Sequence, residues 1–244
     1  MNIGILPKII HPSWDEFLTD EIKNELKEIE SKIGNNYNPK KEYVFRFLEN
    51  DLDNIKVVIL GMDPYPQEGA AIGRCFQVGG HTSWDDKFNK SLQNIFKLIH
   101  KTYMDIKEYS DIGSLKIIRK DIKDNKFNIL APCDMFDSWE KQGVLLLNAT
   151  LTVEINNSGS HLDIWSGFSK KLIKFIDKKR PRANWFLWGN DAQNVGKDII
   201  NGIKHESRHP SRTSSKYEND FLKSNCFRDT MKINNEADKI NWLG

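Results

Sequence analysis

Three short apolar runs, separated by long stretches of helical pattern, constrain the fold of this chain most. They are IKVVIL at 55–60, GVLLLN at 143–148 and NWFLWG at 184–189, and a shorter candidate, IKHES, follows at 203–207. Continuous apolar runs of this length, ended by turn residues, are typical of strands that are covered on both faces. Strands that alternate with helices form parallel sheets. The sequence therefore predicts an α/β fold, a three-layer α/β/α sandwich around a central, mostly parallel sheet of about four strands.

Amphipathic patterns predict helices in the intervals. Segment 13–32 begins with Ser13 in an S-x-x-E capping box, and in segment 91–103 Ser91 stands where an N-cap is expected. Further helices are expected at 42–50, 163–178, 190–200 and 218–232. Segment 104–135 is mixed in charge and has no clean period, which indicates an insertion or a partly helical excursion. We interpret residues 1–244 as a single domain.

The charge balance of the chain is almost even, with 36 basic and 34 acidic residues and a formal net charge of +2. Overall charge does not indicate a nucleic-acid binder, so any such site must be local. The three cysteines, Cys75, Cys133 and Cys226, have no metal-binding or redox spacing and favour reduced thiols. No signal peptide is evident, and the apolar runs are too short to span a membrane. A cytoplasmic protein without membrane contact is expected.

Polar residues follow the predicted strands directly, at the edge where open parallel sheets bind ligands. Met62-Asp63-Pro64-Tyr65 follows the first strand, Asn148 ends the second, Gly189-Asn190 follows the third, and HPSRTSS at 209–215 follows the fourth. Each residue has an ordinary structural interpretation, because Asp-Pro starts turns and an amide or imidazole can satisfy loose backbone groups. Their convergence on one rim instead predicts a site with a carboxylate, an amide and an imidazole.

The triplet HPS occurs twice, at 11–13 and at 209–211. At the first, the predicted helix cap by Ser13 explains the motif, and His11 needs no chemistry. The second is followed by Arg212, Thr213 and two serines rather than by an amphipathic run. Hydroxyls and cations in a loop suit phosphate oxygens. We therefore assign chemistry to His209 and not to His11.

These residues resemble the family 1 uracil-DNA glycosylases. VVILGMDPYP at 57–66 is similar to that family's water-activating loop, usually G-Q-D-P-Y-H. The other matching segments follow in order and spacing: CFQV at 75–78, SLQNI at 91–95, SWEKQGVLLLNATLTV at 138–153, WGNDAQ at 188–193 and HPS at 209–211. The resemblance spans about 13–243, and 104–135 matches poorly, which marks it as a family-atypical insertion.

The resemblance implies two catalytic residues and three that recognise the base. Asp63 would position the attacking water and stabilise positive charge on the sugar, and His209 would stabilise the leaving uracil anion at O2. Asn148 would read N3 and O4 of uracil, Phe76 would stack on the flipped base, and Tyr65 would crowd the 5-position so that thymine is excluded. A site that stabilises an oxocarbenium-like sugar and an anionic base needs negative charge near the sugar and hydrogen-bond donors near the base.

The resemblance also implies DNA contacts. Ser91, Ser211 and Ser214 would grip phosphates, and Arg212 and Thr213 would occupy the loop that inserts into the DNA. Thr213 stands where the family has leucine, Pro66 where it usually has histidine, and Met62, next to the base, where it usually has glutamine.

The implied activity is that of a monofunctional glycosylase that removes uracil from single- or double-stranded DNA and leaves an abasic site, with free uracil as product. No cofactor and no metal are implied; a monomer is expected, and a proteinaceous glycosylase inhibitor is a candidate partner.

Two alternative functions stay open. One is a glycosylase for a modified pyrimidine, admitted by a rim altered at Met62, Pro66 and Arg74. The other is a DNA-binding replication-accessory protein with little turnover. A small-molecule nucleotide enzyme is disfavoured, because the chain has no Gly-rich phosphate loop.

Overall fold

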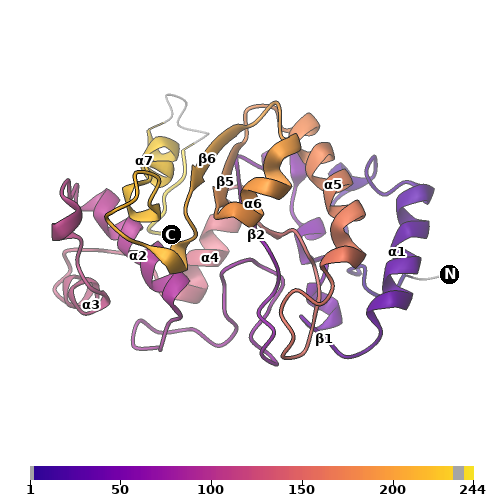
Figure 1. Ribbon diagram of the computed structural model, residues 1–244, viewed down its shortest axis with the longest axis horizontal. Helices are drawn as coiled ribbons and strands as arrows, with labels where there is room; N and C mark the ends of the chain where they lie inside the picture. The colour runs from indigo at the N-terminus through magenta and orange to yellow at the C-terminus, as the bar shows by residue number, and fades with distance from the viewer. Residues whose placement is uncertain (1–2, 233–238) are drawn as a thin grey trace.

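A four-stranded, fully parallel sheet lies at the centre of the computed structural model, which describes residues 3–232 and 239–244 (Figure 1). Its strands are β2 (Val57–Gly61), β3 (Val144–Asn148), β5 (Asn184–Trp188) and β6 (Ile203–Ser207), in the order β3-β2-β5-β6. All four strands were predicted, and the parallel sheet is confirmed. A separate two-stranded antiparallel sheet pairs β1 (Tyr37–Asn38) with β4 (Val153–Glu154).

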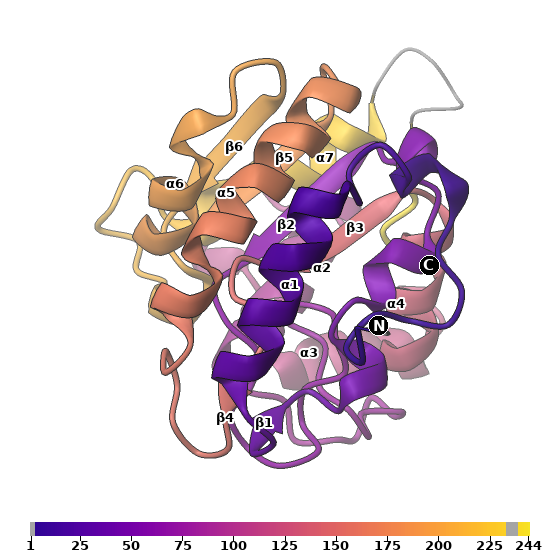
Figure 2. The ribbon, with the colours of Figure 1, turned by 90° about the vertical axis from the view of Figure 1, so that its right-hand side faces the viewer.

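Helices cover both faces of the sheet, and side chains alternate between two core clusters. Val58 and Leu60 of β2 join the cluster under α1 (Asp20–Ile33), α5 (Leu162–Lys179) and α6 (Asn190–Val195). Val57 and Ile59 point to the opposite cluster, under α2 (Lys90–Tyr103), α4 (Pro132–Lys141) and α7 (Cys226–Met231). Figure 2 shows α1 and α5 in front of the sheet and α2 and α4 behind it. The predicted three layers are confirmed. The predicted domain, 1–244, also includes residues 1–2 and 233–238, which lie outside the described residues.

The first helix begins later than the capping box predicts. α1 starts at Asp20, and Thr19 is its N-cap, with the Thr19 hydroxyl accepting from the Ile22 N–H. Ser13 lies in a short 3-10 helix, Pro12–Trp14, and its hydroxyl accepts from the Leu52 N–H at 2.9 Å. A tertiary contact therefore replaces the expected cap. The prediction that Ser13 caps this helix is wrong; His11 instead caps the short 3-10 helix, with its side chain accepting from the Ser13 N–H.

Three other helical segments also differ in extent from the prediction. Segment 42–50 forms two 3-10 helices, Lys41–Tyr43 and Arg46–Glu49, instead of one α-helix, although its buried residues have helical spacing. Segment 190–200 is α6 followed by a 3-10 helix, Gly196–Asp198. Segment 218–232 is a 3-10 helix, Phe221–Lys223, followed by α7. At α2 the N-cap is Asn89, whose side chain accepts from the Leu92 N–H, so the capping role predicted for Ser91 is wrong.

Segment 104–135 is partly helical. It contains a 3-10 helix, Tyr109–Asp111, then α3 (Leu115–Lys123), and the first residues of α4. α3 is fixed by Ile118, which is fully buried, and by Arg119, whose guanidinium donates to the carbonyls of Trp84 and Asp86. Within the described ranges, no helix combines the length and apolar character that crossing a membrane requires.

Candidate active site

The carboxyl ends of all four strands meet at one edge of the sheet. Gly61 pairs with Asn148 across β2 and β3, and Trp188 pairs with Ser207 across β5 and β6. The residues after these strands line a cavity of about 620 Å³. Its lining includes Met62, Asp63, Phe76, Ser158, Gly159, Trp188, Asn190, Asp191, Arg208, His209, Ser211 and Arg212. The structure therefore brings the predicted carboxylate and imidazole to one cavity.

Asp63 lies two residues beyond β2 and is partly exposed at the cavity. Its Oδ2 accepts two hydrogen bonds, from the Ser158 hydroxyl at 2.7 Å and from the Gly159 N–H at 2.8 Å. Among the described residues these are the only donors to the carboxylate, so Oδ1 has no protein partner. A carboxylate held by one oxygen leaves the other for a water or a cationic sugar.

His209 follows β6 and has a defined tautomer. Its Nδ1 accepts from the Ser211 N–H at 3.2 Å and lies 2.8 Å from the Ser211 hydroxyl. A nitrogen that accepts a backbone N–H carries no proton, so in the neutral ring Nε2 carries the hydrogen and is the donor. Burial lowers the pKa of His209; the Arg212 cation lowers this pKa further and Asp191 raises it in part. The site thus holds a neutral imidazole donor.

We expect His209 to be mainly neutral at pH 6.5, the ordinary pKa of histidine, because its pKa is lowered. Because its pKa in the folded protein lies below the unfolded value, the contacts of the neutral ring contribute stability above pH 6.5, and this contribution is lost as pH falls through the lowered pKa. Nitrogen-15 NMR of the imidazole, assigned by comparison with His209→Gln, should show an unprotonated Nδ1 and a protonated Nε2 at pH 6.5. A half-protonated ring, or the opposite tautomer, would contradict the assignment.

The two HPS triplets share one local geometry. His11 Nδ1 also accepts from the N–H of Ser13, at 3.3 Å, and lies 2.8 Å from its hydroxyl. Their locations differ, because His11 lies 3.6 Å from Asp51, in the segment that leads into β2, whereas His209 lies beyond the opposite end of the sheet. The cavity, and not the motif, distinguishes the two histidines.

Phe76 forms one wall of the cavity. Its backbone has φ of 62°, and its ring centroid lies 5.3 Å from that of Trp188 and 6.1 Å from that of His209. An L-residue in this left-handed region is uncommon and is held by its surroundings. Gly189, with φ of 96°, lets His209 pack against its backbone, because a Cβ at this position would lie 2.9 Å from the Cβ of His209.

Tyr65 and Asn148 lie beside the cavity but are not part of its lining. The Tyr65 hydroxyl donates to the Phe76 carbonyl at 3.1 Å and accepts from the Asn89 amide at 3.0 Å. Burial raises the pKa of Tyr65 to about 12, so it remains a neutral phenol. Asn148 is buried, and its side-chain amide has no hydrogen-bond partner among the described residues. A Cβ at Gly61 would come within 2.4 Å of its Oδ1, so glycine leaves room for this amide.

Two of the three predicted phosphate-binding serines lie on elements that contact each other, and Ser214 follows the second element. Ser91 is in the first turn of α2, and Ser211 is in the 3-10 helix Pro210–Arg212. One helical turn beyond Ser91, the buried Asn94 amide donates to the Pro210 carbonyl at 2.6 Å and to the Thr213 hydroxyl at 3.3 Å. The Ser214 N–H donates to Asp220. Arg212 is exposed at the cavity, whereas the hydroxyl of Thr213 is turned back to α2.

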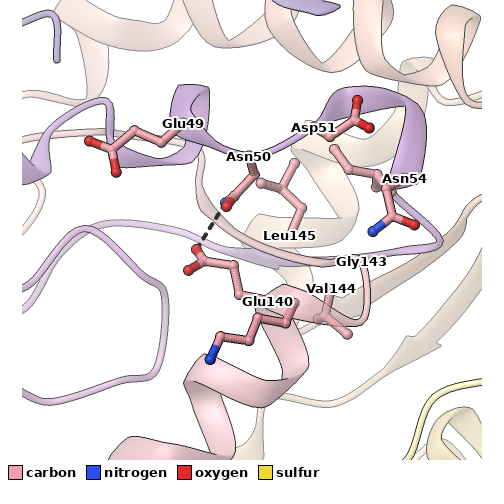
Figure 3. Close-up of a pocket in the computed structure, with 10 residues that line it drawn as sticks. Glu49, Asn50, Asp51, Asn54, Glu140, Gly143, Val144 and Leu145 are labelled. Carbon is pink, nitrogen blue, oxygen red and sulfur yellow. Dashed lines mark hydrogen bonds between the residues drawn. The ribbon is translucent and has the colours of Figure 1, made fainter. Parts of the chain in front are cut away.

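Arg74 does not lie at the rim of the cavity, which corrects the role assigned to it in the modified-pyrimidine hypothesis. Its side chain is only 5% exposed and forms ion pairs with Glu140 and Asp137, and it also donates to Gln77 at 2.9 Å. Glu140 accepts from Asn50 as well, as Figure 3 shows. Arg74 therefore ties the backbone that precedes Phe76 to α4.

A smaller cavity of about 200 Å³ lies at the opposite edge of the sheet, where β2 and β3 begin (Figure 3). Glu49, Asp51, Asn54 and Glu140 contribute polar groups to its lining. Throughout the part of the chain that the structure describes, no three histidine, cysteine or acidic side chains are grouped so that they could hold a metal ion.

Comparison with known proteins identifies the family. Residues 49–232 match the model of the family described as the Uracil DNA glycosylase superfamily. A uracil-DNA glycosylase of Borrelia turicatae (strain 91E135) is 38% identical over 244 residues, covering 95% of this chain and 96% of the relative. The chain belongs to the uracil-DNA glycosylase superfamily. Another member, from Francisella tularensis subsp. holarctica (strain OSU18), is 35% identical and covers 94% of this chain and 98% of its own length.

Solved structures of uracil-DNA glycosylases show the same fold. The mimivirus enzyme has a TM-score of 0.62 at 23% identity, covering 86% of this chain and 72% of its own. The wild-type enzyme from Nitratifractor salsuginis has a TM-score of 0.65 at 20% identity, covering 83% and 85%. A mimivirus variant has also been solved in complex with the inhibitor UGI.

Ser158 and Gly159, the donors to Asp63, were not predicted as site residues of this uracil-DNA glycosylase superfamily member. They lie in the loop between β4 and α5, about a hundred residues along the chain from Asp63. The only sequence signal was the turn-forming composition of NNSGS at 156–160, which is typical of any loop.

Proposed function

We propose that this chain is a monofunctional DNA glycosylase that hydrolyses the N-glycosidic bond of uracil flipped out of DNA and leaves an abasic site. The observation that carries the proposal is the pairing, across one cavity, of the Asp63 carboxylate with the neutral Nε2–H donor of His209. Bond cleavage creates positive charge on the sugar and negative charge on the base. These two groups have the polarity that such a transition state requires.

Base recognition in this proposal uses Asn148, Phe76 and Tyr65. The Asn148 amide, which is buried and has no hydrogen-bond partner among the described residues, would pair with the polar edge of uracil, and this pairing would offset the desolvation of the amide. The Phe76 ring would stack on the base. Met62, half-buried and at the cavity, would contribute apolar contact beside it.

Binding of DNA would rest on a small number of local contacts. Flipping a base out of the stack costs a few kcal/mol, and contacts to the flanking phosphates offset this cost. Ser91, Ser211 and Ser214 would supply hydroxyls for those phosphates, with the Asn94 bridge holding α2 against the HPS loop. Arg212 and Thr213 would face the vacated position in the DNA.

We further propose that the protein acts as a monomer, without a cofactor, in the cytoplasm where DNA is accessible. A proteinaceous glycosylase inhibitor is a candidate partner, because one occupies the mimivirus complex.

Replacing Tyr65 by alanine is expected to weaken the exclusion of thymine. The Tyr65 ring is fixed by hydrogen bonds at its hydroxyl, and its removal would open space for a 5-methyl group. We expect the preference for uracil over thymine to fall by roughly 10- to 200-fold, the range for one methyl group in a pocket. Release of both bases from matched oligonucleotides measures this preference. Tyr65→Phe keeps the ring and should keep the discrimination; equal discrimination by Tyr65→Ala would refute the assignment.

A comparison of bases in one oligonucleotide sequence tests the proposed substrate. The purified protein is incubated with strands that carry a single uracil, thymine or 5-hydroxymethyluracil, and the released base is quantified. We expect release of uracil alone. Faster release of the 5-substituted base would replace the proposal by the modified-pyrimidine hypothesis, and binding without release of any base would favour a DNA-binding accessory protein.

A further inference from the structure

The loop between β4 and α5, residues 155–161, contacts the catalytic carboxylate directly. Ser158 Oγ and Gly159 N donate to the same oxygen of Asp63, Oδ2, at 2.7 and 2.8 Å. Two of the three residues after Asp63 are prolines, Pro64 and Pro66, and neither has an N–H to donate. Within the described part of the chain, this loop therefore supplies every hydrogen bond that orients the carboxylate.

The loop is itself fixed to the rest of the molecule. Inside it, the Ser160 hydroxyl accepts from the Glu154 N–H at 2.8 Å, and at its end the buried His161 lies 2.8 Å from the Thr152 hydroxyl. Trp165 of α5 donates to that same hydroxyl at 2.7 Å. The two donors to Asp63 thus sit on a loop whose base is anchored in the core.

A second contact joins this loop to the segment that follows Asp63. The Asn156 N–H donates to the Pro66 carbonyl at 2.8 Å. From beneath, the buried Asn38 amide donates to the carbonyls of Pro66 at 2.9 Å and of Gln67 at 2.8 Å. The segment 63–67 is therefore held on both sides, and the direction of the Asp63 side chain is set by Ser158 and Gly159.

We propose that Ser158 is a positioning residue for the reaction. Together with the Gly159 N–H, it fixes Asp63 through Oδ2, so that Oδ1, which has no protein donor among the described residues, is the oxygen presented to the attacking water and the cationic sugar. Preorganised groups accelerate a reaction because they need not reorient as charge develops. This inference rests on the proposed function, in which Asp63 is the catalytic carboxylate.

The test compares Ser158→Ala with Ser158→Thr, which keeps a hydroxyl, and with Ser166→Ala. Ser166 is a matched control, because it is an exposed serine on α5 whose hydroxyl donates only to the Asp163 carbonyl. Three quantities are measured: the single-turnover rate of uracil release at saturating protein, the Kd for an oligonucleotide whose 2′-fluoro deoxyuridine resists cleavage, and the midpoint of thermal unfolding.

We expect Ser158→Ala to lower the single-turnover rate about tenfold, as the loss of one hydrogen bond to a charged group would do. Its Kd and unfolding midpoint should match the wild type, because Ser158 is exposed and the substitution removes one hydrogen bond at the surface. Ser158→Thr should recover most of the rate, and Ser166→Ala should behave as wild type.

Two results would overturn the inference. An unchanged rate for Ser158→Ala would show that Gly159 alone positions the carboxylate, and a weaker Kd that accounts for the whole loss would assign Ser158 to DNA binding instead. Failure of the proposed function is distinguishable, since the wild-type protein would then release no uracil at all.

Discussion

Replacing Asp63 by asparagine is expected to reduce the single-turnover rate of uracil release by about a thousandfold, the upper end of the range for one electrostatic group at a transition state. The substitution keeps the shape of the side chain and its acceptor oxygen for Ser158 and Gly159, but it removes the negative charge. The cationic sugar then loses its counter-charge, and the attacking water loses its orienting base. Rapid-quench measurement of free uracil at saturating protein gives the rate.

Binding of DNA should survive this substitution, because Asp63 carries negative charge and does not attract the phosphates. Asp163→Asn, which changes an exposed carboxylate on α5, is the matched control and should leave the rate unchanged. A variant at Asp63 that retained a tenth or more of the wild-type rate would show that the carboxylate is not central to catalysis.

Replacing His209 by alanine is expected to slow uracil release by roughly a hundredfold or more, since a single donor aimed at developing charge contributes about 3 kcal/mol. The leaving uracil would lose the Nε2–H donor that the Ser211 N–H holds in place through Nδ1. The rate should fall while the Kd for uncleavable DNA changes little.

The first HPS triplet provides a close control for this experiment. His11 has the same tautomer-defining contacts with Ser13 as His209 has with Ser211, but it lies beside Asp51, near the opposite end of the sheet. His11→Ala should therefore leave the rate unchanged. Equal losses in the two variants would indicate that both histidines act on folding rather than on chemistry.

Local patterns were sufficient to predict the sheet and the convergence of its strand ends. Apolar runs fix where buried strands lie, and parallel connections then place residues such as Asp63 and His209 at one edge. The register of the strands, with Gly61 opposite Asn148, confirms that placement.

Features that depend on distant partners could not be predicted from local pattern. Ser13 looked like a helix cap, but its hydroxyl accepts from Leu52, 39 residues away. Arg74 looked like a rim residue, but Glu140, 66 positions later, holds it in the interior. Ser158 reaches Asp63 across 95 positions, which no periodicity reveals. Tertiary contacts decided each of these positions.

A single-turnover assay of the unaltered chain tests directly whether the protein excises uracil from DNA. A 5′-labelled oligonucleotide with one uracil is incubated with excess protein, and both free uracil and alkali-labile abasic sites are quantified. We expect the two to appear in equal amounts, with no strand cleavage before alkali. Intact DNA bound by the protein, without any released uracil, would contradict it.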